Sequence, residues 1–189
     1  MEIFCLPAPS SSPLTEASCL CFAALTRRFV SLLLTLGCDI ASFQSLEAEL
    51  SALPGRYCAA NKGGLWLALV AHNHSGKDLA KELADFPSLH LGCRGPFAAV
   101  GCIALRDLGA GRGELKRMFV DDKFRRGGIG KKLVDSALAC ARELGYGELV
   151  LDTLGRLPDA KALYERTGFS AIPPYCENPC EDVFLGMRL

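Results

Sequence analysis

The chain alternates between short continuous apolar runs and stretches in which apolar residues recur at helical spacing. The clearest helical pattern covers 129–144, where one face would carry Ile129, Leu133, Val134, Ala137, Leu138, Ala141 and Leu144. A strand-like run, Glu114–Val120, lies just before it. The pattern therefore predicts a strand and a helix joined by the intervening loop.

The pattern of apolar and polar residues also predicts the other helices and strands. Apolar runs predict strands at 65–71, 97–105, 149–151, 169–172 and 183–189. Helical spacing and stop signals predict helices at 29–36, 43–50, 79–86 and 159–167. The strands 97–105 and 114–120 are separated by a glycine-rich turn and should form an antiparallel hairpin. The run 149–151 is apolar at every position, which indicates a strand buried on both faces.

The loop between the strand 114–120 and the following helix has the composition of an anion site. The first N–H groups of a helix lack partners within it and carry partial positive charge. Gly127, Gly128 and Gly130 have no Cβ, so a ligand can approach the backbone closely. Positive charge comes from Lys123, Arg125, Arg126, Lys131 and Lys132. We call residues 123–132 the anion-binding loop and expect it to hold phosphates.

Two common phosphate motifs do not fit this loop. A Walker loop needs a glycine at position 125 and a Ser or Thr at 132, where this chain has Arg125 and Lys132. A dinucleotide fingerprint needs a glycine at position 133, which is Leu133. The pattern that does fit is Arg-x-x-Gly-x-Gly, formed by Arg125, Gly128 and Gly130.

Composition bounds the class of protein. The chain has 189 residues, half of them hydrophobic, which is enough for the core of one domain. Lys plus Arg equals Asp plus Glu, so no global positive field points to nucleic acid or to an anionic membrane. We expect residues 1–25, rich in Pro and Ser, to be a disordered extension and residues 26–189 to form the domain.

The ten cysteines and three histidines show no zinc-like spacing, so we expect no metal. Buried or free thiols in a reducing compartment are the expected state of the cysteines. No basic head precedes an apolar stretch, and a signal peptide is therefore not expected. We expect a cytoplasmic protein, with organelle targeting by residues 1–25 as the alternative.

From Phe97 to the C-terminus the chain resembles the GNAT superfamily of acyl-CoA-dependent N-acetyltransferases. The Arg-x-x-Gly-x-Gly loop resembles the family's pyrophosphate loop, and the order of strands and helices around it is similar. Leu163-Tyr164, followed by Gly168-Phe169, looks like the family's Leu-Tyr-x-x-x-Gly-Phe signature. The segment 72–97 departs from the family's usual short hairpin.

This resemblance implies an α/β (α+β) GNAT fold. It would have a mixed, mostly antiparallel sheet of six to seven strands with helices on both faces. The strands 114–120 and 148–153 would be parallel neighbours that splay apart. The cosubstrate acetyl-CoA would enter this splay along the backbone of Met118, Phe119 and Val120. Its pyrophosphate would lie on the loop residues Arg125, Arg126, Gly127, Gly128, Ile129, Gly130 and Lys131.

The resemblance also implies candidate catalytic residues. Glu114 stands where several GNAT enzymes carry a general base, and the alternative is a carboxylate exposed at a strand start. Tyr164 is the candidate acid for the departing thiolate, and the alternative is an aromatic side chain packed in the core. The Met118 N–H could polarise the thioester carbonyl. Tyr175 and Asn178 could line an acceptor pocket, although Pro173, Pro174 and Pro179 also explain that stretch as a turn.

The implied reaction is direct acetyl transfer to a primary amine of a small molecule or protein. A non-catalytic acyl-CoA-binding regulatory module is the alternative, because the loop alone would serve that role. The sequence specifies neither the acceptor amine nor the oligomeric state.

Overall fold

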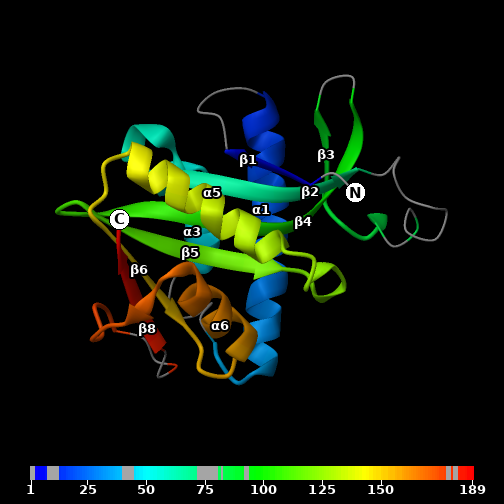
Figure 1. The fold of residues 1–189 in the computed structure, drawn as a ribbon. Coiled ribbons are helices and arrows are strands. Elements are labelled where there is room, and N and C mark those ends of the chain that lie inside the picture. Colours follow the sequence, from blue (N-terminus) through cyan, green and yellow to red (C-terminus); the bar gives the residue numbers. More distant parts are fainter. Residues whose placement is uncertain are drawn as a thin grey trace.

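The computed structural model describes residues 3–7, 13–39, 45–71, 81, 83–91, 94–177, 180 and 183–189. Its centre is a single mixed sheet that helices cover on both faces (Figure 1). The predicted α/β architecture is therefore confirmed.

The sheet contains eight strands, of which seven follow the order β1-β2-β4-β5-β6-β8-β7, while β3 pairs with the extended end of β4. Every pairing is antiparallel except that of β5 with β6. The bounds are β1 Ile3–Pro7, β2 Gly64–Ala71, β3 Ser88–Leu91, β4 Arg94–Gly109, β5 Arg112–Val120, β6 Glu148–Thr153, β7 Ser170–Ala171 and β8 Val183–Arg188. The expected six to seven strands become eight because β1, from the supposed extension, and β3, from the segment 72–97, are added to those predicted.

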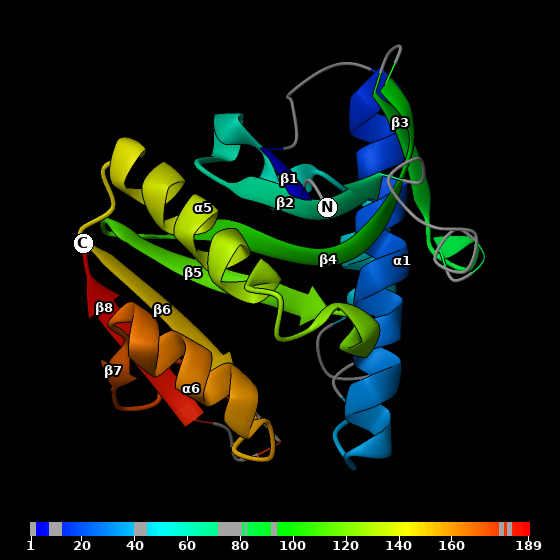
Figure 2. The same cartoon turned by 45° about the vertical axis from the view of Figure 1, so that its right-hand side comes forward.

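The parallel pair β5–β6 separates after three residue pairs. The ladder runs from Arg112–Glu148 to Glu114–Val150 and then ends, although both strands continue. Figure 2 shows the two strands together near the C-terminal label and diverging toward their arrowheads. The predicted splay is thus present, and it opens at the end of β5 that leads into the anion-binding loop.

Two helices cover one face of the sheet, which we call the α5 face. They are α5 Ile129–Glu143 and α6 Pro158–Thr167 (Figure 2). The predicted apolar stripe of α5 is buried, with Leu133, Val134 and Ala137 fully enclosed. α6 begins with Pro158 and ends at Gly168, whose φ of 107° needs glycine, as the stop signal predicted.

The opposite face, the α1 face, is covered by α1 Pro13–Thr35 and α3 Leu46–Ser51. Short 3₁₀ turns lie at Gly55–Tyr57 and Ala59–Asn61, and another at Asp122–Phe124 follows β5. Leu46 and Leu50 of α3 are buried, which agrees with the predicted helical face.

α1 corrects two expectations. It is one helix through residue 25, so the boundary between a disordered extension and the domain is wrong, and the predicted helix 29–36 is only its last part. Pro13 stands at the helix start, and Phe22 and Leu25 are fully buried in the core of the α1 face. Residues Glu16–Thr35 also have the length and mean hydropathy, 1.5, of a membrane-spanning helix, a test that buried core helices pass too.

Part of the segment 72–97 is a hairpin. β3 pairs with residues 94–98, so the predicted strand 97–105 is longer at both ends. Of the predicted helix 79–86, residues 81 and 83 are helical and 84–86 form a turn, whereas residues 79, 80 and 82 lie outside the described part of the chain, as does Asn178.

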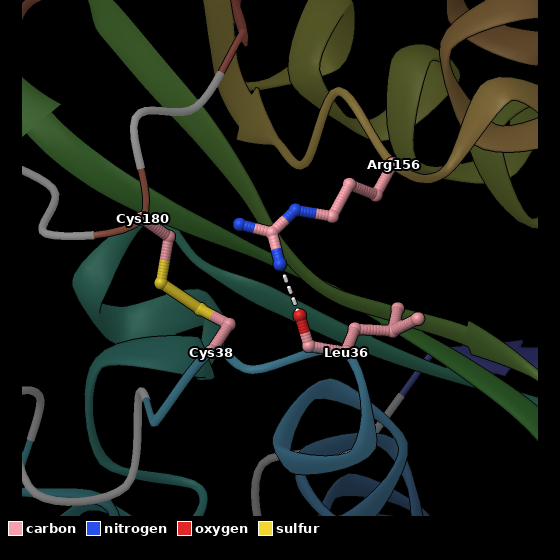
Figure 3. Close-up of a disulfide and its surroundings, with 4 residues drawn as sticks. All are labelled: Leu36, Cys38, Arg156 and Cys180. Carbon is pink, nitrogen blue, oxygen red and sulfur yellow. Dashed lines mark hydrogen bonds between the residues drawn. A yellow bond between two sulfur atoms is a disulfide. The ribbon is translucent and has the colours of Figure 1, made fainter.

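A disulfide joins Cys38, just after α1, to Cys180 in the chain before β8 (Figure 3). The Cα atoms are 5.9 Å apart, and the two cysteines are separated by 142 positions. The expectation that all cysteines are free thiols is therefore wrong for this pair. Beside it, Arg156 donates a hydrogen bond to the Leu36 carbonyl, which also holds the end of α1 (Figure 3).

Candidate active site

The anion-binding loop has the backbone of an anion nest. Arg126 and Gly128 both adopt left-handed conformations, with φ of 65° and 78°. Gly128 directly precedes α5, so the free N–H groups at the helix start lie next to it. A Cβ built on Gly128 would meet no protein atom within 4 Å. This position is therefore open to a ligand, as predicted from the sequence.

Three of the basic and glycine residues of the loop have close contacts within the protein. The Arg125 Nε donates to the Val120 carbonyl at 2.8 Å, and the Lys131 Nζ lies 2.6 Å from Asp135. A Cβ on Gly130 would lie 3.1 Å from both Leu163 and Met118. Arg125 therefore has a structural role in fixing the loop and Gly130 in packing α5 closely, whereas Lys131 forms an exposed pair within α5.

The backbone of β5 beyond the ladder is the predicted path of the pantetheine arm. Met118 packs against the core under α5, while Phe119 is buried in the α1-face core, and Val120 ends the strand. Within the described chain β5 pairs only with β4 along this stretch, because its ladder with β6 has ended. The edge that faces the splay is thus available for another extended chain.

Glu114 is the centre of a buried polar cluster on the α1 face. It is fully buried, and we define the polar cluster as Arg106, Glu114, Lys116, Asp152 and Tyr175. Arg106 pairs with its Oε2, whereas the Tyr175 hydroxyl donates to Oε1 at 2.9 Å. The Lys116 Nζ lies 3.5 Å from the same Oε1. The alternative of an exposed carboxylate is therefore wrong: both oxygens of Glu114 contact protein groups.

Lys116 and Asp152 face each other across the fork of the splay. Each stands two positions beyond the last ladder pair, Glu114–Val150, and their Nζ and Oδ1 atoms are 2.9 Å apart. Their side chains are 10% and 8% exposed. An ion pair thus lies at the point where β5 and β6 begin to diverge.

Tyr164 lies on α6 and its ring packs in the core of the α5 face, 5.8 Å from the Phe169 ring. Burial, and then the negative charge of Asp152, raises the pKa of Tyr164. The phenol is protonated at neutral pH, as an ordinary tyrosine is, and its raised pKa makes it a weaker acid than an ordinary tyrosine. The core-packing alternative also describes its ring.

Tyr175 reaches the polar cluster from the segment after β7. Its ring packs edge-on against Phe184 with centroids 5.5 Å apart. Burial, followed by the charges of Glu114 and Asp152, raises the pKa of Tyr175. Sequence reasoning placed Tyr175 near an acceptor, but its link to Glu114 joins residues too distant along the chain to be seen there. Asn178 lies outside the described residues.

A second buried ionic group was missed from the sequence. The Arg117 guanidinium donates to both carboxylate oxygens of Glu49, at 2.9 and 3.1 Å, and the Tyr57 hydroxyl donates to Glu49 at 2.9 Å. Nothing in the local pattern of α3 marks Glu49, since the partner lies far along the chain. Among the described residues, no group of three His, Cys, Asp or Glu side chains is placed to hold a metal ion.

Comparison with known proteins matches the part of the chain that contains the splay and the anion-binding loop. The family model for the acetyltransferase (GNAT) domain matches residues 95–171. The IAA acetyltransferase of Azospirillum brasilense is 39% identical over 114 residues, which are 60% of this chain and 72% of that protein. The chain belongs to the GNAT superfamily.

Other relatives match shorter parts. An uncharacterized N-acetyltransferase of Schizosaccharomyces pombe is 39% identical over 48% of this chain, and human N-acetyltransferase 8 is 46% identical over 30%. The matches span only 56% and 25% of those two proteins. A GNAT acetyltransferase of Staphylococcus aureus shares the fold, with a TM-score of 0.66, 20% identity and 99% of both chains covered.

Some of the candidate residues lie inside the GNAT domain match and others lie outside it. It contains β5, the anion-binding loop, α5, β6 and α6, and hence Glu114, Gly128 and Tyr164. Tyr175 and Glu49 lie outside it. The matched residues thus hold the splay and its loop together with Glu114 and Tyr164.

Proposed function

We propose that the protein is an N-acetyltransferase that transfers the acetyl group of acetyl-CoA to a primary amine of a small molecule or protein. The observation that carries this proposal is the conjunction of the splay and the nest at one end of β5. The relatives are N-acetyltransferases by name, and a GNAT acetyltransferase of Elizabethkingia anophelis with the same fold has acetyl-CoA bound (TM-score 0.55, 20% identity, covering 99% of this chain and 98% of that one).

The residues fit this cosubstrate. Gly128 leaves open space beside the free amides at the start of α5, which is what a pyrophosphate needs. The free edge of β5 offers Met118 and Val120 for backbone contacts with an extended arm. Acetyl-CoA supplies an activated acyl group, and the chain supplies the position and the proton transfers.

Proton transfer from the amine is assigned to Glu114 acting through Tyr175. Glu114 is too enclosed to meet an amine itself, whereas Tyr175 is partly exposed and donates its proton to Glu114 Oε1. A hydroxyl in that position can accept a proton from the amine as it passes its own proton to the carboxylate. Tyr164, whose phenol is protonated at neutral pH, is assigned to the departing thiolate.

The regulatory-module alternative stays in consideration for one reason. The engagement of both Glu114 oxygens by Arg106, Lys116 and Tyr175 would also be expected of a purely structural ion cluster. In that case the chain would bind acetyl-CoA without turnover. The cytoplasmic location remains a prediction under either function.

The deciding experiment incubates the protein with acetyl-CoA and a panel of small amines and lysine peptides. Products are read by mass spectrometry, because six described cysteines are free and would interfere with thiol reagents. The proposal predicts an amine product that carries one added acetyl group and is absent with Gly128→Val. Tight acetyl-CoA binding with no product from any amine would favour the regulatory module, and no CoA binding would overturn both.

A further inference from the structure

The splay depends on an irregularity in β5 that has an energetic cost. Between Phe119 and Lys116, β5 has one more residue than the facing segment of β4, Cys102–Ala104. This is a β-bulge, which bends a strand and increases its local twist. It lies directly beyond the last β5–β6 ladder pair, at Glu114. The bulge is thus where β5 turns away from β6.

The residue that adopts the unusual backbone conformation is not a glycine. Arg117 has a φ of 55°, in the left-handed region that disfavours side chains with a Cβ. Such conformations persist only where the surroundings hold them in place. In this chain, a contact of the Arg117 side chain or of its neighbours must therefore hold the backbone at position 117 in this conformation.

The structure shows that contact. The Arg117 guanidinium forms a two-pronged pair with Glu49 of α3, through Nε–Oε1 and NH2–Oε2 contacts. The two side chains are 3% and 9% exposed, so water screens the pair little. Two parallel bonds fix the direction of a guanidinium as well as its distance. Tyr57 in turn holds the Glu49 carboxylate.

We propose that Glu49 is a positioning residue for acetyl-CoA: through Arg117 it holds the β5 bulge and so keeps the splay open. This inference rests on the proposed function for its ligand. It assigns to α3, outside the matched GNAT domain, a role in the cosubstrate site on the sheet. Glu49 itself contacts Arg117 and Tyr57, and its effect on the ligand is transmitted by the backbone of β5.

Two substitutions at position 117 separate the backbone from the ion pair. Arg117→Gly and Arg117→Val both remove the pair with Glu49. Glycine adopts positive φ readily, whereas a β-branched residue resists it. If the bulge is what matters, the CoA dissociation constant should be about tenfold higher for the valine variant than for the glycine variant, which corresponds to about 1.4 kcal/mol.

Glu49→Gln tests the other end of the pair, and Tyr57→Phe is its matched control. The control removes the hydroxyl bonded to Glu49 and leaves the contact between Arg117 and Glu49 intact. Both variants should lose some thermal stability, but Glu49→Gln should weaken CoA binding more than Tyr57→Phe does. Adding Arg117→Gly to Glu49→Gln should restore much of the affinity, because glycine no longer needs the pair.

Hydrogen exchange in the absence of ligand keeps the test independent of the proposed function. With the bulge lost, β5 can pair further along β6, so amides of residues 115–118 should exchange more slowly in Arg117→Val than in the wild type and Arg117→Gly. Equal exchange and equal CoA affinity in the glycine and valine variants would overturn the proposal. If the wild type failed to bind CoA, the proposed function would fail, and comparing exchange in Glu49→Gln with that in the wild type would still decide whether Glu49 holds the bulge.

Discussion

The two faces of the sheet are built from different interactions. The α5 face is an apolar core, with the anion-binding loop formed by one continuous segment at the start of α5. The α1 face contains buried ion pairs, Glu49–Arg117 and the polar cluster, and a disulfide that joins distant segments. The first face should therefore respond to changes in backbone shape, and the second to changes in charge and in covalent linkage.

The largest effect is expected on the α5 face, from Gly128→Val. The branched side chain would fill the open space beside the helix start and would also strain a φ of 78°. A ligand that binds only the folded state raises the melting temperature. CoA should therefore raise the melting temperature of the wild type but not that of Gly128→Val. Gly145→Val is the matched control, because Gly145 has a φ of 77° and equally open surroundings away from the loop. Equal loss of CoA binding in both variants would mean that strain alone is responsible.

Tyr164→Phe should come next. It keeps the packed ring and removes the hydroxyl that is assigned to the thiolate, so turnover should fall by about 10²–10⁴ with CoA affinity nearly unchanged. The measurement is single-turnover kinetics. Tyr146→Phe is a suitable control, since its hydroxyl bonds the Lys62 carbonyl outside the proposed site. Unchanged chemistry in Tyr164→Phe would reduce this residue to core packing.

Glu114→Gln tests the α1 face through both the stability of the protein and the pH dependence of its rate. Removing one partner of a buried pair leaves Arg106 uncompensated, although Lys116 keeps its pair with Asp152, and such a loss typically costs about 3–5 kcal/mol of stability. If Glu114 is the final proton acceptor, the rate should fall most near neutral pH. It should recover partly at alkaline pH, where the amine arrives deprotonated. A loss that is equal at all pH values would show that Glu114 orients the cluster and takes no proton.

The disulfide should contribute a further part of the stability of the α1 face. Its closed loop is long, so Cys38→Ser combined with Cys180→Ser should lower the free energy of unfolding by about 2–5 kcal/mol in denaturant titrations. Cys176→Ser, at an exposed free cysteine, is the control and should change little. Wild-type stability that is the same with and without reductant would show that the bond does not form in solution.

The smallest expected effect is on thermal stability at acidic pH. Burial opposes ionisation of Glu49, but the hydrogen bonds and charge of Arg117 outweigh it and hold the pKa of Glu49 below its usual value. A depressed folded-state pKa stabilises the protein above the unfolded pKa, about 4.3, and this contribution is lost as pH falls through the folded value. The difference in melting temperature between wild type and Glu49→Gln should therefore shrink below about pH 4.3. A constant difference across that range would contradict the assigned charge state.

The contrast between the faces also explains what the sequence could predict. Gly128, the helix after it and the buried strand at 149–151 were predictable, because each signal is carried by neighbouring residues. The partners of Arg117 and Glu114 come from segments far apart in the chain, and no local spacing marks them. The path of α1 was missed because Pro13 and the nearby serines suggested disorder, whereas burial of Phe22 and Leu25 favours a helix. The Cys38–Cys180 pair has no spacing signature for the same reason.

Hydrogen exchange with and without CoA tests most directly whether the splay and its loop hold the cosubstrate. Peptides that cover residues 115–120 and 126–131 should become protected when CoA is added, since the edge of β5 and the amides at the start of α5 gain partners. Peptides from α3 and α6 should change much less. Protection confined to the α1-face helices, or CoA binding with no change along β5 and the loop, would contradict this site.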